Sequence, residues 1–540
     1  MKYLLSFLTL VLLFGCQNKE KVDLIVINGN IYTVNDNFDM AEAFAVKDGK
    51  LVEIGSTKAI QDNYEASEIV DAEGKAVFPG FIDAHCHFFG LGLAEQNVRL
   101  EGTKSYDEVL ERLVAFQKEK KLSFITGRGW DQNDWENKEF PTKEKLDQLF
   151  PDTPVALTRV DGHALLVNQA AIDLAGVTTE TPFSGGYILQ KDGQLTGIFI
   201  DNPMSLIRAQ IPAESTDTYR SALKDAERIC FSYGLTTVND AGLSRETIEL
   251  IDSMHNSKEL KMRIYAMVSG SPENLDYYLN KGIYKTERLN VRSFKIYGDG
   301  ALGSRGAALR APYSDQDGHY GAMRHPNSFF EEAAERIANS EFQMNTHAIG
   351  DSANHYLLKT YQRVLKDHSD RRWKIEHAQI VSPEDFEAFK NIVPSVQPTH
   401  ATSDMYWAED RVGSERIKGG YAYKELLNQY GRVALGTDFP VEKVSPFLTF
   451  YAAVARKDLN QYPENGYQIE NALTREETLK GMTIWAAHSN FEEDEKGSLE
   501  KGKLADFIIL EQDIMTIDID KVPATKVAFT YINGEKVFEN

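Results

Sequence analysis

The long middle of the chain alternates short apolar, strand-like runs with amphipathic helical segments. Eight runs have the length and the β-branched or aromatic content of strands: 81–84, 235–239, 263–268, 291–296, 342–346, 373–376, 392–396 and 433–436. Because a helix separates successive strands, the strands pair in parallel through crossover connections. Eight parallel strands with outer helices close into a barrel. We therefore predict an α/β protein built on a (β/α)8 TIM barrel, formed by residues 79–99 and 213–495.

The connection between the first two strands is much longer than a crossover needs. Roughly 150 residues separate positions 84 and 235, whereas a crossover helix with its loops takes little more than a dozen. We therefore expect residues 101–212 to form an inserted subdomain near the mouth of the barrel.

The two ends of the chain have a different sequence pattern, in which short strand-like runs end at tight turns. The segment 22–27 runs into Asn28-Gly29, and 529–532 runs into Asn533-Gly534. Asn-Gly pairs supply the positive φ angles that two-residue hairpins require. This shared chemistry predicts that residues 22–77 and 497–540 join in one small β-sandwich domain.

The first residues have the pattern of an export signal. An apolar run at 3–15 follows Lys2 and is too short to span a bilayer comfortably. The run ends in Leu-Phe-Gly-Cys16, which resembles a bacterial lipobox. We interpret residues 1–16 as a lipoprotein signal peptide, with a plain N-terminal anchor as the alternative. The protein would then be exported and held at a bacterial membrane, on its periplasmic side or at the cell surface, only through a lipid on Cys16.

Composition excludes some classes of partner and leaves others open. The chain has 81 acidic and 59 basic residues and a formal charge of −22, which disfavours binding to nucleic acid. Three cysteines are too few for a disulfide framework. A homo-oligomer is compatible with these numbers.

Two histidines end the first predicted strand. His85 and His87 are two positions apart, so a strand would direct both side chains into the barrel mouth. An isolated His-x-His pair is weak evidence for a metal, because two hydrogen-bonded rim histidines give the same pattern.

Further donor residues follow other predicted strands at the same edge of the sheet. His347, His377 and Asp438 each come directly after one of them. Imidazoles and a carboxylate that converge on one mouth are improbable as packing, because each buried polar group needs its own partner. Together they form a nitrogen and oxygen ligand set suited to zinc or a similar divalent ion.

Lys295 lies inside an apolar predicted strand. It could extend out of the strand to water or pair with a carboxylate. Near metal ions and away from water its amine would instead lose its proton. The neutral amine could then take up CO₂ to form a carbamate, which offers two oxygens to two metals.

Five motifs resemble one known family. They are FPGFIDAHCH at 78–87, KIYGDGALGSR at 295–305, THAIGD at 346–351, EHA at 376–378 and GTDFP at 436–440. They resemble the amidohydrolase superfamily and, within it, amidohydrolase family 3, the group that contains N-substituted formamide deformylases. The resemblance spans residue 22 to the C-terminus.

The resemblance implies a site with two divalent metal ions, Zn above all, with Mn, Fe or Ni as alternatives. It assigns His85, His87 and Asp438 to one ion, His347 and His377 to the other, and a carboxylated Lys295 to the bridge between them. Three other residues resemble positions near the family's pocket and are candidate substrate contacts, although rim packing would also explain them: His400, His163 and Trp130.

The segment 298–303 spells G-x-G-x-x-G after a strand, which is the dinucleotide-binding pattern. No βαβ unit follows it, so we interpret these glycines as positions where the backbone approaches the site.

The predicted function is hydrolysis of a C–N amide bond, linear or cyclic, in a small molecule. Metal-activated water would attack the carbonyl, with Asp438 as the base that takes the proton and delivers it to the leaving nitrogen. One alternative is a mononuclear deaminase, although Asp351 stands where that enzyme would carry a glutamate. Another is a non-catalytic ligand-binding lipoprotein, which would have no need of a water-activating carboxylate.

Overall fold

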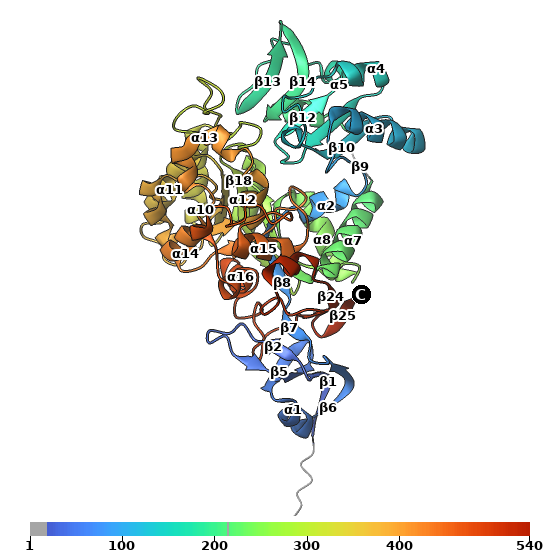
Figure 1. The fold of residues 1–540 in the computed structure, drawn as a ribbon, viewed down its shortest axis with the longest axis vertical. Coiled ribbons are helices and arrows are strands. Elements are labelled where there is room, and N and C mark those ends of the chain that lie inside the picture. The colour runs from blue at the N-terminus through green and yellow to red at the C-terminus, as the bar shows by residue number, and fades with distance from the viewer. Residues whose placement is uncertain (1–18, 213–214) are drawn as a thin grey trace, which may run out of the picture.

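The computed structural model describes residues 19–212 and 215–540. The predicted signal peptide and Cys16 lie outside the described residues. The molecule is elongated and has three parts, with the terminal β-sheets at one end, the barrel in the middle and the insertion at the other end (Figure 1). Within the described residues, no helix has the length and apolar character needed to cross a membrane.

The barrel prediction is confirmed. Its eight parallel strands follow one another in chain order around the sheet: β8 (Phe81–Cys86), β15 (Leu235–Leu243), β16 (Arg263–Ser269), β18 (Leu289–Tyr297), β19 (Gln343–Ala348), β20 (Lys374–His377), β21 (Val393–Val396) and β22 (Ala434–Leu435). The ring closes between the last strand and the first, where Asp438 N donates to His85 O at 2.8 Å and His87 N donates to Phe439 O at 2.8 Å. These two bonds already tie together the backbone of the predicted site.

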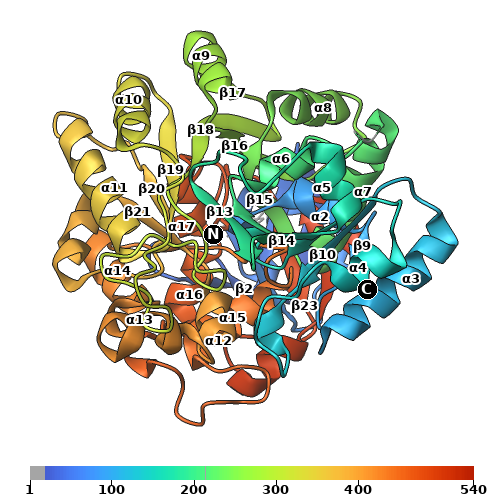
Figure 2. The same cartoon turned by 90° about the horizontal axis from the view of Figure 1, so that it is seen from above.

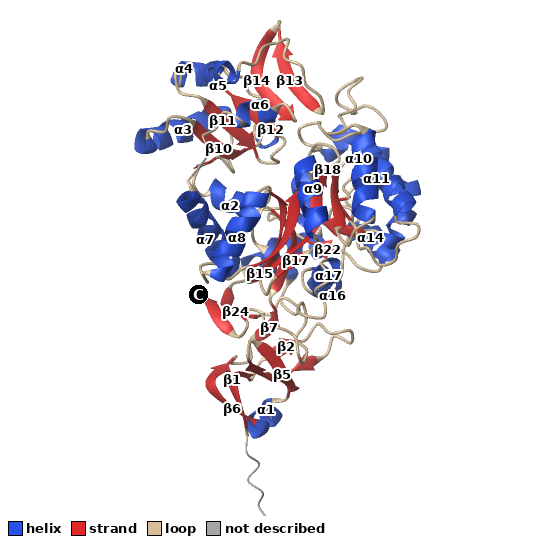
Figure 3. Ribbon diagram, turned by 180° about the vertical axis from the view of Figure 1, so that it is seen from behind, coloured by secondary structure: helices blue, strands red, loops and turns tan. Residues whose placement is uncertain are grey.

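Helices surround the barrel, as the view from above shows (Figure 2). They are α7 (Thr216–Ser232), α8 (Arg245–Asn256), α9 (Pro272–Lys281), α10 (Asn327–Ala338), α11 (Asp351–Val364), α14 (Tyr423–Tyr430), α15 (Pro446–Ala455), α16 (Arg475–Gly481) and α17 (Ile484–Ser489). Serine caps begin several of them, as where Ser244 Oγ accepts from Thr247 N. Figure 3 separates the strands of the barrel wall from the helices outside it.

One helix is shorter than its sequence suggests. A capping box at Thr474 and Glu477 starts α16, as the Thr-x-x-Glu pattern indicates. The helical pattern continues to His488, but the structure breaks at Thr483, whose φ of −139° and ψ of −99° are not helical. Gly481 packs against the barrel here, since a Cβ at this position would lie 2.6 Å from Leu435 Cγ. Close packing on the barrel therefore overrides the local helical pattern.

The insertion folds around its own mixed sheet, in the order β13-β14-β12-β11-β10-β9. Its strands are β9 (Val98–Arg99), β10 (Ile125–Trp130), β11 (Val155–Arg159), β12 (Ala164–Val167), β13 (Gly186–Lys191) and β14 (Gln194–Asp201), and its helices include α3 (Tyr106–Lys120), α4 (Glu144–Leu149), α5 (Gln169–Ala175) and α6 (Met204–Arg208). The sheet begins at Val98, so this short strand belongs to the insertion and not to the barrel segment in which the sequence placed it.

Two sheets form the end of the molecule opposite the insertion. One joins β1 (Glu20–Ile27), β4 (Ala43–Lys47), β5 (Lys50–Gly55) and β6 (Tyr64–Asp71). The other combines both ends of the chain: β2 (Asn30–Tyr32), β3 (Met40–Ala41) and β7 (Ala76–Pro79) with β23 (Phe507–Leu510), β24 (Val527–Ile532) and β25 (Glu535–Glu539). The link is the antiparallel pairing of β7 with β23. The two sheets share a core in which the rings of Phe44 and Phe507 lie 5.0 Å apart.

A buried ion pair joins the base of the barrel to this terminal sheet. Arg263, at the start of β16, donates from Nε to Asp506 Oδ2 at 2.6 Å and from Nη2 to Asp506 Oδ1 at 3.1 Å. We expect Arg263→Ala to destabilise the protein by about 3–5 kcal/mol, because Asp506 would remain buried without its cation. Urea unfolding at pH 7 measures the difference.

The exposed pair Lys58 and Asp62 gives the control for this prediction. Lys58→Ala should change the unfolding midpoint little, because exposed ion pairs contribute little to stability.

Burial alone would raise the pKa of Asp506, but Arg263 holds that pKa below its usual value. The stabilisation by the pair should therefore be present at neutral pH and be lost as the pH falls through that lowered pKa. An Arg263→Ala variant as stable as wild type at pH 7 would contradict this account.

Candidate active site

The carboxyl ends of the barrel strands bring the predicted donors together. His85 is the last residue but one of β8, His87 follows the strand, and Asp438 follows β22 with a φ of +61°. Asp83, which the sequence reading missed, fixes this geometry. Its Oδ1 accepts from the backbone N of His85 and of Thr437, each at 3.1 Å, and its Oδ2 accepts from Thr437 Oγ1 at 2.6 Å. The first and last strands are thereby held in register at the site.

Asp438 lies at the centre of the cluster. Its Oδ1 is 3.3 Å from His87 Nε2 and 3.6 Å from His85 Nε2. Its Oδ2 is 3.6 Å from His400 Nε2 and 4.0 Å from His377 Nδ1. Two sets of three donor atoms meet the spacing of a metal site, His85 with His87 and Asp438, and His377 with His400 and Asp438.

Hydrogen bonds orient three of the imidazole rings. Nδ1 of His85 lies 2.6 Å from Glu376 Oε2, Nδ1 of His87 lies 3.0 Å from Ala241 O, and Nδ1 of His377 lies 2.7 Å from Gln397 Oε1. Each acceptor favours the tautomer with the proton on Nδ1, in which Nε2 carries the lone pair that can bind a metal. This is the arrangement by which proteins orient histidine ligands to a metal.

His347 and Lys295 complete the inner group. The ring of His347 lies 4.6 Å from that of His377, and its Nε2 is 3.4 Å from Gly300 O. Lys295 is 1% exposed, and its Nζ is 3.1 Å from His85 Nε2. The structure therefore brings all six residues of the predicted ligand set to one end of the barrel.

Burial and neighbouring charges shift the pKa of the central groups. Burial lowers the pKa of Lys295 to about 8, although the charges of Glu376 and Asp438 act the other way. Burial alone would raise the pKa of Asp438, but the neighbouring imidazoles, His87 above all, hold it well below its usual value. Asp438 is therefore a carboxylate at neutral pH, ready to accept a proton or to bind a cation.

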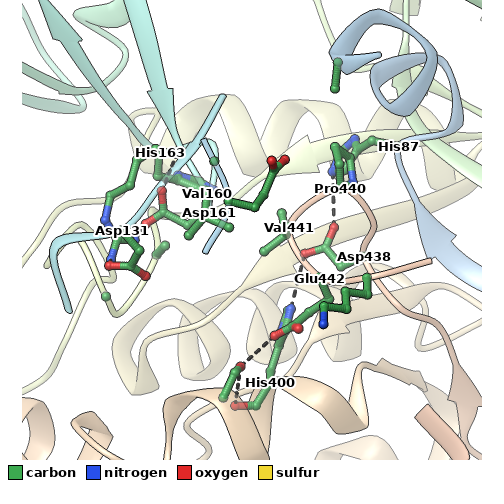
Figure 4. A pocket seen from close by; sticks show the side chains of 18 of the residues that line it. His87, Asp131, Val160, Asp161, His163, His400, Asp438, Pro440, Val441 and Glu442 are labelled. Carbon is green, nitrogen blue, oxygen red and sulfur yellow. Dashed lines mark hydrogen bonds and ion pairs between the residues drawn. The ribbon is translucent and has the colours of Figure 1, made fainter. Parts of the chain in front are cut away.

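A cavity of about 730 Å³ covers these donors and is walled by both the barrel and the insertion. His163 reaches it from the insertion, where its Nδ1 lies 2.6 Å from Asp201 Oδ1 and its ring lies 5.0 Å from that of His347. His400 reaches it from α12 (Pro398–Asp404). Figure 4 shows Asp131, Asp161 and His163 on one side, and His87, Asp438, His400 and Glu442 on the other.

Trp130 is not in the cavity, so the structure does not support its prediction as a substrate contact. The side chain is fully buried in the core of the insertion, and its Nε1 donates to Leu157 O at 2.8 Å. The neighbours Gly129 and Asp131 line the cavity instead. The Trp130 indole is a large apolar group that is stabilised by burial in the core of the insertion. Because neighbouring residues of a strand face opposite sides, Asp131 faces the cavity.

The glycines of the look-alike motif allow close backbone packing. A Cβ on Gly298 would lie 2.5 Å from His347 O, and a Cβ on Gly300 would lie 2.3 Å from Asp201 Oδ2. They let the loop after β18 pass between His347 and the insertion. Asp351, the position relevant to a deaminase, does not line the cavity and accepts from Arg310 N at 2.9 Å.

The donors fit a divalent metal centre. Nitrogen and oxygen ligands suit zinc and similar ions. Moreover, Asp438 Oδ1 and His400 Nε2 are buried without a hydrogen-bond partner among the described residues, a cost that a bound cation would remove. A barrel whose mouth gathers these groups beneath a substrate-sized cavity defines the class of metal-dependent barrel hydrolases.

Comparison with known proteins agrees with this class. Residues 68–538 match the model of the amidohydrolase family. The protein LONG AFTER FAR-RED 3 of Arabidopsis thaliana is 33% identical over 96% of this chain and 91% of its own length. The N-substituted formamide deformylase of Arthrobacter pascens is 24% identical over 96% and 98% of the two chains. A metal-dependent hydrolase from Pyrococcus horikoshii superimposes with a TM-score of 0.75 at 28% identity, over 92% of this chain and 99% of the other.

The chain belongs to the amidohydrolase family, and the proteins it resembles include a metal-dependent hydrolase and a formamide deformylase. The resemblance drawn from the five sequence motifs is thereby confirmed.

Proposed function

We propose that this protein hydrolyses the C–N bond of a small-molecule amide, of the N-substituted formamide, N-acyl or cyclic type. The observation that carries the proposal is the position of Asp438, whose two oxygens face imidazoles on both sides at the floor of the cavity. A carboxylate so placed can hold cations and also take a proton from water. The similarity to a formamide deformylase supports the amide class of substrate.

The chain's own residues would divide the work of the reaction. His85, His87, His347, His377, Asp438 and Lys295 would hold the metal centre, which when bound polarises the carbonyl and makes water more acidic. Asp438 would accept the proton of the attacking water and return it to the leaving nitrogen. His163, fixed by Asp201, and His400 would donate to the oxygen on which charge develops.

We further propose two divalent ions, most simply Zn, with Mn, Fe or Ni as alternatives, and a carbamate on Lys295. The support is that Lys295 is buried next to His85, where an ammonium group would repel any ion that the histidine binds. A carbamate would replace this repulsion with an anionic bridge.

An activity screen tests the function directly. The protein without residues 1–16 is purified, freed of metal, reloaded with Zn²⁺ or Mn²⁺, and assayed against N-formyl, N-acyl and cyclic amides. We expect amine release from at least one class, and loss of that activity with a chelator. An enzyme that contains metal and releases no amine from any of the three classes would refute the proposal.

We also propose that the protein is exported and anchored through a lipid on Cys16. The support is the apolar run at 3–15 followed by the lipobox-like Leu-Phe-Gly-Cys16. In a Gram-negative host fed radiolabelled palmitate, the full chain should carry label and fractionate with membranes. Cys16→Ser should abolish the label, whereas Cys230→Ser, a buried cysteine of α7, should leave it unchanged. An unlabelled wild-type protein in the soluble fraction would refute the anchor.

A further inference from the structure

The two walls of the active-site cavity differ in how their carboxylates are neutralised. On the insertion side, the buried Arg159 pairs with two of the acids: its Nη1 lies 2.6 Å from Asp161 Oδ2, and its Nη2 pairs with Asp131. On the barrel side, Asp404 and Glu442 also line the cavity, but neither forms an ion pair among residues 19–212 and 215–540. Among the described residues, the barrel wall therefore presents two half-buried carboxylates without a cation, whereas Asp134, the unpaired acid of the insertion wall, is exposed to water.

Neutral groups hold both of these carboxylates in place. Asp404 Oδ2 accepts from Tyr421 Oη at 2.8 Å and from Gln379 Nε2 at 3.1 Å. Glu442 Oε1 accepts from Ser403 Oγ at 2.6 Å. The other oxygen of each carboxylate has no hydrogen bond to a described residue, and the adjacent Lys443 is exposed. The two acids are thus oriented but not neutralised.

His400 lies between this wall and Asp438 and offers a further polar group to a ligand. It precedes Asp404 by one turn of α12, so the two lie on the same face of the helix. The residue is 9% exposed, and its Nε2, which lies 3.6 Å from Asp438 Oδ2, has no hydrogen-bond partner among the described residues. Figure 4 shows His400 beside Glu442, on the side of the cavity that holds Asp438. A polar ligand that reaches this wall would meet one imidazole and two carboxylates.

The carboxylates of this wall favour a ligand that carries a positive charge. A carboxylate held away from water without a cation is costly, so it either takes up a proton or binds a positive group. Burial raises the pKa of Asp404 to about 7 and also raises the pKa of Glu442, with nearby His400 acting in the opposite direction for both. A ligand ammonium would favour the charged form of both carboxylates.

We propose that Asp404 and Glu442 form a cation-recognition subsite, so that the substrates are amides that carry an ammonium or other basic group away from the scissile bond. This proposal rests on the proposed amide hydrolysis and deepens it. The subsite lies about one helical turn, ~5.4 Å, beyond His400. An extended chain spans about 3.5 Å for every three bonds. The basic group should therefore lie roughly five to eight bonds from the carbonyl carbon.

A pair of matched amides tests the proposal. N-formyl-1,5-diaminopentane carries the ammonium seven bonds from the formyl carbon, and N-formylhexylamine replaces that ammonium with a methyl group of similar size. With the zinc-loaded enzyme, we expect kcat/KM for the cationic amide to exceed that for the neutral amide by about 30-fold or more. Glu442→Gln and Asp404→Asn keep the shape and the hydrogen bonds but remove the charge. Each should erase most of this preference while leaving the neutral amide within about threefold of wild type.

Glu95→Gln is the matched control. Glu95 also lines the cavity, but its carboxylate is paired with Arg99 at 3.2 Å, so its removal should leave the preference intact. Equal turnover of the two amides by the wild type, or a preference that survives in both Glu442→Gln and Asp404→Asn, would overturn the proposal.

A binding measurement separates failure of the subsite from failure of the proposed function. Calorimetry with 1,5-diaminopentane on the metal-free protein requires no hydrolysis. We expect wild type to bind the diamine and Glu442→Gln to bind it at least tenfold more weakly. If neither formamide is hydrolysed but Glu442→Gln still binds the diamine at least tenfold more weakly than wild type, the result supports the cation subsite and refutes formamide hydrolysis. If the diamine binds both proteins alike, or if Glu442→Gln loses one equivalent of bound zinc, the subsite does not recognise an organic cation and the proposal fails.

Discussion

Asp438→Asn should lower kcat by about 10²–10⁴-fold while the protein stays folded. The amide occupies the same space as the carboxylate and can still face His87 and His400, but at neutral pH it cannot accept a proton. Because Asp438 sits within 4.0 Å of four imidazoles, no other carboxylate of the cavity is placed to take over its role. Steady-state kinetics on the best amide of the screen gives the measurement.

Three further measurements decide how the loss arises. Metal content by mass spectrometry should stay close to that of wild type, and circular dichroism should show an intact barrel. Asp134→Asn, which removes an exposed carboxylate at the outer rim of the cavity, should keep wild-type turnover. If Asp438→Asn keeps both its metal and most of its activity, a different residue takes the proton.

Lys295→Ala should lose bound metal and most activity. An ammonium group 4 Å from a cation would cost roughly 4 kcal/mol per unit of charge product at an effective dielectric of about 20. A lysine retained at this position must therefore be neutral or anionic when metal is bound, and our proposal makes it an anionic bridge. We expect the variant to hold about one equivalent of metal instead of two, and added short carboxylic acids to restore metal and activity in part by filling the vacated space.

Lys374 provides a control of the same kind on β20, two strands away in the barrel. It is also fully buried, burial lowers its pKa to about 8, and its Nζ donates to Asn490 Oδ1 at 2.8 Å. Lys374→Met should affect stability but leave metal content unchanged. If Lys295→Ala retains two metal equivalents, or if a metal-loaded crystal structure of active enzyme shows a bare amine at Lys295, the bridge is refuted.

The sequence was enough to predict the barrel and the residues at its mouth. Periodicity located the eight strands, and in a parallel barrel every strand ends at the same rim. His347, His377 and Asp438 were therefore predicted as neighbours because each follows a strand. Hairpin chemistry also indicated strands at both ends of the chain. All of these are properties of local sequence combined with one rule of topology.

Only the tertiary structure decided what surrounds those donors. Glu376 holds the His85 ring across 291 residues of chain, and Asp201 holds His163 from a different strand of the insertion. Tertiary contacts also decided that Arg159 pairs with the acids of the insertion wall and that Trp130 packs into the core of the insertion instead of lining the cavity. Which way a side chain faces on a short strand depends on the volume and charge of its neighbours in space. Those neighbours come from distant segments, so no local pattern in the sequence encodes them.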